Sequence, residues 1–185
     1  AVEPVLRRVV APDLRVLDIG CGNGSMARHL ASRGYRVTAF DLAEDGLAQA
    51  RAIPSPVSWA LGSVYDDDLG ERLGTDFSIA ISLEVVEHLY FPRRLFAAAR
   101  QCLRTEGTFV VSTPYHGYAK NLALALCGAW DEHFNVGWDG GHIKFFSRQS
   151  LRELAQDCGF REVSFRGAGR LPYLWKSMVI EYQKL

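Results

Sequence analysis

Short apolar runs alternate with amphipathic stretches along most of the chain. An apolar run of about four to eight residues is typical of a strand buried on both faces of a parallel sheet. Such runs give the candidate strands 14–19, 35–40, 57–61, 77–82, 108–113, 160–166 and 173–182. Because helical patterns lie between the earlier strands, the chain predicts an α/β fold with a mostly parallel, doubly wound sheet.

Two helices are marked by apolar stripes and by end signals. The first covers residues 92–103 and begins at Pro92, a residue that suits a first helical turn. The second follows Ser147, a good N-cap residue, and ends at Cys158 before Gly159. Their buried faces are expected to hold Leu95, Phe96, Ala99, Cys102 and Leu103, and Leu151, Leu154, Ala155 and Cys158.

Residues 16–24, VLDIGCGNG, join the first strand to a predicted helix through a turn with three alternate glycines. Glycine is needed where a chain turns sharply or where a ligand approaches the backbone closely. The helix over residues 23–31 would present its free N–H groups to whatever lies in the turn. A strand, a glycine turn and a helix in this order predict the first βα unit of a nucleotide-type cofactor site.

Charges near the turn separate the cofactors that such a unit can bind. A dinucleotide site prefers glycine or alanine at position 25, where this chain has Ser25. Asp18 would repel a pyrophosphate but would attract the ammonium and sulfonium groups of S-adenosylmethionine. Asp41 ends the second strand and can accept hydrogen bonds from ribose hydroxyls in either case. The turn therefore favours S-adenosylmethionine over NAD.

Composition narrows the classes of partner and compartment. The 185 residues predict one domain, 1–185. The 21 Lys and Arg balance the 21 Asp and Glu, so no overall field attracts nucleic acid or an anionic membrane.

The four cysteines lack Cys-x-x-Cys spacing and fit reduced thiols in the cytoplasm. No apolar stretch approaches the roughly 20 residues that span a bilayer, so stable membrane insertion is not expected. The chain starts at Ala1, which leaves a targeting segment upstream open.

Three segments together resemble the class I S-adenosylmethionine-dependent methyltransferases: VLDIGCGNG, Asp41, and LEVVEHL at 83–89. The resemblance extends from about 14 to 184 and includes LRTEGTFVVSTP at 103–114. HIKFFSRQSLRELAQDCGF at 142–160 is similar to the last helix of the small-molecule group nearest the ubiquinone-biosynthesis O-methyltransferases. The resemblance implies a Rossmann-like sheet of seven strands whose last strand is antiparallel.

The resemblance also assigns a cofactor site. Gly20 and Gly22 would lie against the methionine part, with Asp18 orienting its amino group, Asp41 holding the ribose and Leu42 packing on the adenine. The full set of implied cofactor residues is Asp18, Gly20, Cys21, Gly22, Asn23, Asp41, Leu42, Ser63, Val64, Leu83, Glu84 and His88. Ser63 departs from the aspartate frequent in the family. A neutral acceptor makes a weaker hydrogen bond, so Asp66 could take over the contact with the adenine amino group.

Glu84, Glu87 and His88 follow the fourth predicted strand at i, i+3 and i+4, so a helical turn would place them on one face. Three interpretations compete. The resemblance implies that Glu84 lies near the methionine end and that His88 braces the turn or faces the substrate. The three side chains would also suit a divalent metal, on which some ubiquinone-pathway relatives depend. His88 could instead be structural and bonded to the backbone.

Residues 114–141 form a long aromatic-rich insert, interpreted as a cap on the substrate side. Tyr115, His116 and His142 are the candidate catalytic residues, because histidine most often acts as a base near pH 7. Within the insert, residues 121–130 are apolar nearly all round, which predicts a buried helix. That helix would cover the core or the substrate, touch a lipid-soluble acceptor, or pack in a homodimer.

These observations predict an S-adenosylmethionine-dependent methyltransferase acting on a small molecule, at oxygen rather than nitrogen or carbon. The alternative is a non-catalytic S-adenosylmethionine-binding regulatory module. An NAD-dependent oxidoreductase is disfavoured by Ser25 and Asp18. The chain also lacks the Asn-Pro-Pro-Tyr type of run seen in enzymes that methylate base amines.

Overall fold

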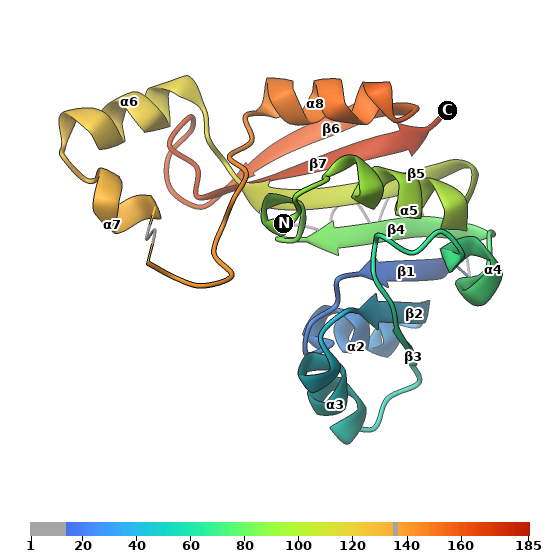
Figure 1. Ribbon diagram of the computed structural model, residues 1–185. Helices are drawn as coiled ribbons and strands as arrows, with labels where there is room; N and C mark the ends of the chain where they lie inside the picture. Colours follow the sequence, from blue (N-terminus) through green and yellow to red (C-terminus); the bar gives the residue numbers. More distant parts are fainter. Residues whose placement is uncertain (1–13, 135–136) are drawn as a thin grey trace.

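The fold is a seven-stranded sheet in the order β3-β2-β1-β4-β5-β7-β6 (Figure 1). The computed structural model describes residues 14–134 and 137–185. The strands β1 to β5 pair in parallel, and β7 lies antiparallel between β5 and β6. The mostly parallel, doubly wound sheet with an antiparallel last strand is thereby confirmed. The strands are Arg15–Ile19, Arg36–Asp41, Ser58–Leu61, Phe77–Leu83, Leu103–Pro114, Phe160–Ala168 and Ser177–Lys184.

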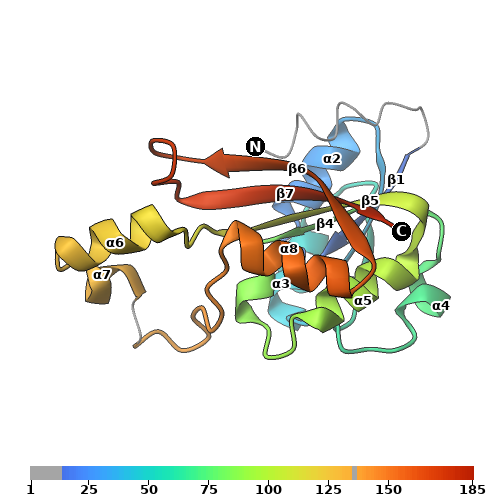
Figure 2. The same cartoon turned by 90° about the horizontal axis from the view of Figure 1, so that it is seen from above.

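Helices cover both faces of the sheet. In Figure 2, α5 and α8 lie along one face and α2 along the other. Side chains of β4 alternate between the two cores, since Ile79 and Ile81 join the α2 side while Ala80 joins the α5 side. The helices are α2 (Ser25–Ser32), α3 (Glu44–Ala52), α4 (Leu69–Leu73), the 3₁₀ helix η1 (Val86–His88), α5 (Arg93–Cys102), α6 (Tyr118–Leu126), α7 (Trp130–Phe134) and α8 (Arg148–Asp157).

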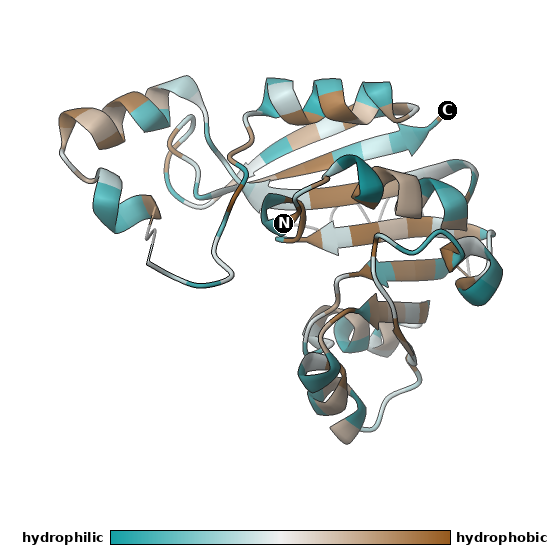
Figure 3. Ribbon diagram, viewed as in Figure 1, coloured by the Kyte–Doolittle hydropathy of each residue, from teal (hydrophilic) through white to brown (hydrophobic). Residues whose placement is uncertain are grey.

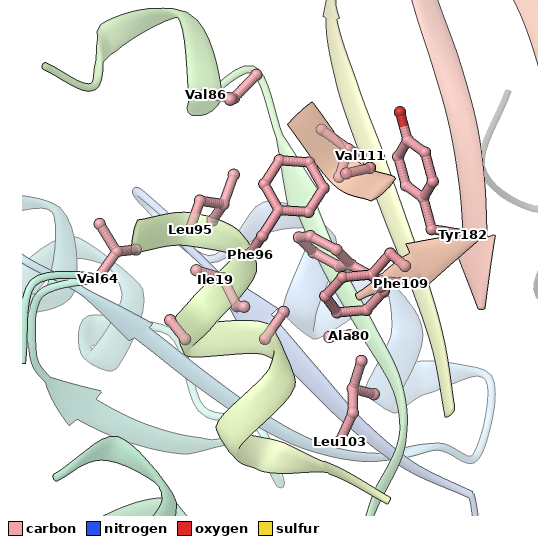
Figure 4. Packing of buried hydrophobic residues seen from close by; sticks show 14 of the residues in the cluster. Ile19, Val64, Ala80, Val86, Leu95, Phe96, Leu103, Phe109, Val111 and Tyr182 are labelled. Atoms are coloured by element: carbon pink, nitrogen blue, oxygen red, sulfur yellow. The ribbon is translucent and has the colours of Figure 1, made fainter. Parts of the chain in front are cut away.

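Phe96 of α5 lies at the centre of the larger core (Figure 4). Its ring meets those of Phe109, Phe160 and Tyr182 edge-on at centroid distances of 5.5, 5.8 and 5.8 Å. Such pairs add to the burial energy of the rings themselves. The predicted apolar stripe of this helix is therefore buried as expected, and the helix fixes the chain that follows β4.

Local signals placed the last helix correctly and the last strand incorrectly. Ser147 caps α8 in a reciprocal pair with Ser150, as expected. The strand predicted over 173–182 instead covers Ser177–Lys184. The predicted strand starts too early, because Tyr173 has φ +65° and belongs with Gly169 and Arg170, also of positive φ, to the connection between β6 and β7.

The helix predicted over 121–130 begins and ends earlier than expected, and the core of its own domain does not cover it. The helix α6 begins at Tyr118 and ends at Leu126, before Gly128 with φ +63°. It projects with α7 past the end of the sheet, where no face of the sheet can cover it (Figures 1 and 2). Figure 3 shows hydrophobic stretches on this helix, and Leu126 is 78% exposed, whereas Lys120 is buried. Of the helices in the described ranges, none is long and apolar enough to cross a membrane.

The exposure of α6 can be tested by mutation. Leu126→Ser should change the free energy of unfolding by less than about 0.5 kcal/mol, because the side chain already faces water. Phe96→Ala should lower it by about 3–5 kcal/mol, because it opens a cavity in the core. Urea denaturation measures both. A loss above about 1.5 kcal/mol for Leu126→Ser would show that α6 is covered in solution, as the predicted homodimer through residues 121–130 requires.

Candidate functional site

The turn after β1 has a backbone shape that glycine permits. Gly20 has φ +74°, and a Cβ there would lie 2.6 Å from Cγ2 of Val85. Gly22 has φ +53°, but a Cβ there would meet no atom within 4 Å, so the turn is open to a ligand at this point. The N–H groups of Gly20 and Cys21 donate to the carbonyl of Phe40 at 2.9 and 3.1 Å. The turn is therefore anchored to the end of β2.

Asp41 completes this anchor with its side chain. Its Oδ2 accepts from the N–H of Gly22 at 2.7 Å, and its Oδ1 accepts from the N–H of Ala43 at 2.8 Å. Asp18 lies close by and is 2% exposed. Its Oδ2 has no hydrogen-bond partner in the protein. Burial, and then the charge of Asp41, raise the pKa of Asp18 to about 7. Two acids with a partly unsatisfied oxygen fit a positively charged ligand.

A pocket of about 810 Å³ opens at the carboxyl ends of β1 to β4. This edge, where the strand order reverses, is where open α/β sheets bind their ligands. Eleven of the twelve predicted cofactor residues line the pocket, and Asp18 lies apart from that lining. Lining residues that the sequence reasoning missed are Phe40, Ala43, Gly62, Tyr65, Val85, Leu89 and Trp138. Most of these residues adjoin the ends of predicted strands, so the predicted strands could have indicated them. Trp138 lies far along the sequence from the other residues of this pocket.

At the predicted adenine edge, Asp66 does not replace Ser63. One oxygen of Asp66 accepts from the N–H of Ser63 at 3.0 Å and from Arg72 at 3.0 Å. These donors lower the pKa of Asp66, the backbone N–H of Ser63 being the larger cause. Asp66 is also not among the pocket-lining residues. Its carboxylate therefore braces the loop, and Ser63 lines the pocket directly.

Glu84 lies at the junction of two pockets. Its φ is +55°, uncommon for a residue with a Cβ, and such strain often accompanies a functional site. Its Oε1 accepts from the hydroxyl of Ser112 at 2.7 Å. Glu84 lines both the larger pocket and a second one of about 270 Å³. The two spaces therefore meet at one carboxylate.

The second pocket is formed mainly by the insert and the segment after it. Its lining is Glu84, Pro114, His116, His133, Phe134, His142, Phe145, Lys176 and Ser177. His116 stacks on Phe134 at 5.6 Å, and burial is the main cause that lowers the pKa of His116 to about 4. Burial also lowers the pKa of His142. Both imidazoles are therefore neutral at pH 7.

Tyr115, the third candidate catalytic residue, belongs to the core. It is 9% exposed and packs against Trp175 at 5.2 Å and Phe165 at 6.4 Å. It lines neither pocket. Tyr115 and His116 are consecutive residues after β5, and consecutive side chains of an extended chain point to opposite sides. The ring of Tyr115 therefore points away from the second pocket that His116 lines.

The expected helical face of Glu84, Glu87 and His88 does not form, although the side chains of Glu84 and Glu87 still hydrogen-bond to each other. Positive φ at Glu84 interrupts the helical turn, so that η1 holds only Val86–His88. Glu87 is fully buried with Oε2 accepting from Thr113 at 2.9 Å, and burial raises its pKa to about 7. His142 takes the place of Glu84, since ligand atoms of Glu87, His88 and His142 lie within 4.8 Å of one another. This group, rather than the predicted one, could hold a divalent metal.

Comparisons with known proteins agree with this geometry. The family model described as a methyltransferase domain matches residues 3–164. The ubiquinone biosynthesis O-methyltransferase of Ruegeria sp. (strain TM1040) is 31% identical over 170 residues, covering 88% of this chain and 66% of that protein. The protein of the same name from Roseobacter denitrificans is 32% identical over 169 residues, with the same coverage. The chain thus spans 66% of the length of these curated relatives.

Solved structures show the same fold at low sequence identity. Magnesium protoporphyrin IX methyltransferase from Synechocystis PCC 6803, solved with bound SAH, superposes with a TM-score of 0.73 at 16% identity, over 100% of this chain and 80% of that one. A SAM-dependent methyltransferase from Methanosarcina mazei gives 0.74 at 21% identity, over 98% and 97%. The chain belongs to the family of S-adenosylmethionine-dependent methyltransferase domains.

Proposed function

We propose that this chain transfers a methyl group from S-adenosylmethionine to a small-molecule acceptor, and that the accepting atom is oxygen. The observation that carries the proposal is the position of Glu84 between the cofactor pocket and a second pocket rich in histidine and aromatic side chains. The relatives named above as O-methyltransferases support oxygen. The neutral charge of the chain disfavours nucleic acid as acceptor. The four free cysteines support a cytoplasmic location.

The larger pocket fits the cofactor on its own chemistry. Asp18 and Asp41 offer negative charge for the ammonium and sulfonium groups, and Asp41 retains lone pairs for the ribose hydroxyls. Leu42 is 68% exposed at the rim, where an adenine ring would cover it. When bound, the cofactor supplies an electrophilic methyl group. The residues of the pocket hold it in one orientation and keep water away.

The second pocket suits an acceptor hydroxyl that loses its proton. Lys176 lines this pocket together with Glu84, and its ammonium group would offset the repulsion between the Glu84 carboxylate and a developing oxyanion. The neutral histidines beside it can each accept a proton. The low pKa of His116 makes it a weak base, which suits an orienting role. His142 lies nearer Glu84, whose charge opposes the lowering of its pKa, and we assign the base role to His142.

The regulatory-module alternative has no comparable support. A chain that only binds the cofactor has no need of an acceptor space. Here the second pocket joins the first and carries three histidines and a lysine. We therefore place catalysis ahead of binding alone.

Asp41→Asn should weaken S-adenosylmethionine binding by about 100-fold, because charge-assisted hydrogen bonds to the two ribose hydroxyls become neutral ones. Isothermal titration calorimetry measures the affinity. Asp45→Asn, an exposed acid on α3, is the matched control and should leave the affinity unchanged. Equal affinity of the Asp41→Asn and Asp45→Asn variants would contradict the ribose assignment.

Asp18→Asn should separate stability from binding. The pKa of Asp18 is raised in the folded state, so the stability of the free protein falls as pH rises from about 4 through about 7. At pH 8 the variant should melt at least about 2 °C above the wild type, and the difference should vanish near pH 4. Its affinity for S-adenosylmethionine at pH 8 should nevertheless fall. A variant less stable than the wild type at pH 8 would refute the raised pKa.

His142→Phe should lower kcat about 10²- to 10⁴-fold while cofactor affinity stays within about threefold, since a general base contributes this much. The assay is formation of S-adenosylhomocysteine with a panel of phenolic and carboxylic acceptors. Because burial lowers the pKa of His142, the acidic limb of the wild-type kcat/KM profile should lie at lower pH than that of an ordinary imidazole. His116→Asn should retain kcat within about tenfold. If the wild type forms no product with any acceptor, the regulatory alternative gains; if His116→Asn is the worse variant, the two roles are reversed.

A further inference from the structure

Trp138 extends the insert over the cofactor pocket. The other described residues that line this pocket lie between Gly20 and Leu89, on the loops after β1 to β4 and on η1. Trp138 follows α7, and it is 59% exposed. An indole ring at the rim of a pocket can bury much of its area against an occupant. The indole ring can therefore contact a ligand that enters or leaves the cofactor pocket.

His88 connects that ring to the rigid part of the molecule. Its Nδ1 lies 3.0 Å from the carbonyl oxygen of Gly140 and 3.3 Å from that of Gly141. Carbonyl oxygens only accept, so Nδ1 carries the proton and donates to them. The His88 ring also meets Trp138 edge-on at 6.5 Å and His142 at 4.9 Å. His88 is thus bonded to the backbone, as one of the three interpretations proposed, and the backbone that it contacts belongs to the insert.

The turn held by His88 moves Trp138 with it. The N–H of Gly141 donates to the carbonyl of Trp138 at 3.0 Å, which closes residues 138–141 into one turn. Gly140 has φ +79°, and a Cβ on Gly141 would lie 2.9 Å from the Trp138 carbonyl. The turn is therefore compact, and fixing the carbonyls of its last two residues fixes its first residue.

The backbone of η1 anchors the next segment independently of the His88 side chain. The carbonyl of Glu87 accepts from the N–H groups of Ile143 and Lys144 at 2.9 and 3.0 Å. Removing the imidazole donor would leave these bonds in place. The segment 138–142 is here called the strap. Without the imidazole donor, the strap would stay attached to η1 at its C-terminal end but would lose the hydrogen bonds that fix the turn containing Trp138.

We propose that His88 is a positioning residue that holds Trp138 across the mouth of the cofactor pocket, so that the strap slows release of the cofactor and of its demethylated product. The inference rests on the proposed function, because it takes the occupant to be S-adenosylmethionine. His88 acts through Trp138 and supplies no proton to the reaction. The strap keeps the occupant in place and water out while the methyl group moves.

Two substitutions at one position separate the donor from the ring. His88→Phe keeps an aromatic ring against Trp138 and His142 but removes the N–H donor. His88→Asn keeps an N–H donor near the same place and removes the ring. Surface plasmon resonance on the immobilised chain, with EDTA present to exclude metals at Glu87, measures the dissociation rate of S-adenosylhomocysteine. We expect release about 5- to 10-fold faster for His88→Phe and within about twofold of wild type for His88→Asn.

A double-variant cycle tests whether His88 acts through Trp138. Trp138→Leu should speed release about as much as His88→Phe, and the double variant should be no faster than Trp138→Leu alone. If the two effects multiply, His88 acts on the occupant directly and the strap is refuted. If His88→Phe releases at the wild-type rate while His88→Asn is fast, ring packing alone is responsible, and the tether is refuted.

The same data separate this inference from the proposed function. A wild-type chain that binds no S-adenosylhomocysteine would overturn the cofactor assignment itself. A wild type that binds, with all three variants releasing at its rate, would overturn the strap alone. Association rates should stay within about twofold in every variant, because an opened strap does not obstruct entry.

Discussion

The site depends on the hydrogen bonds by which Asp41 holds the glycine turn against the end of β2. One carboxylate oxygen takes the N–H of Gly22 and the other takes that of Ala43. These bonds bring a second acid, Asp18, into the field of the first, and burial, followed by the charge of Asp41, raises the pKa of Asp18. Negative charge crowded beside an open turn favours a cationic occupant over a phosphate. The preference for a sulfonium cofactor thus follows from the same contacts that shape the backbone.

The sheet forms the larger pocket, and the insert supplies side chains to the second pocket. The strand order places β1 between β2 and β4, so that the loops after these strands meet at one edge and form the larger pocket. The chain after β5 leaves the sheet and returns, and this excursion supplies His133 and Phe134 to the second pocket. Glu84, at a strained backbone position, lies where the two contributions meet. Acceptor choice can therefore vary with the insert while the cofactor site stays with the sheet.

Features set by neighbours in the sequence could be predicted, and features set by distant contacts could not. The sheet, the α5 stripe, the Ser147 cap and most of the pocket lining follow from local patterns and from the family resemblance. The prediction for residues 121–130 failed because a sequence shows that a segment is apolar without showing which other part of the protein covers it. The assumed face of Glu84, Glu87 and His88 failed because helical spacing ignores the positive φ at Glu84. Trp138 was missed because only the fold brings the insert back to η1.

A crystal structure of the protein grown with S-adenosylhomocysteine would show whether the pocket beside Asp18 and Asp41 holds the cofactor. We expect both ribose hydroxyls within hydrogen-bond distance of the Asp41 carboxylate, and the amino-acid end beside Gly20 on the Asp18 side of the turn. A ligand whose ribose lies away from Asp41, or density for the ligand only outside this pocket, would contradict it.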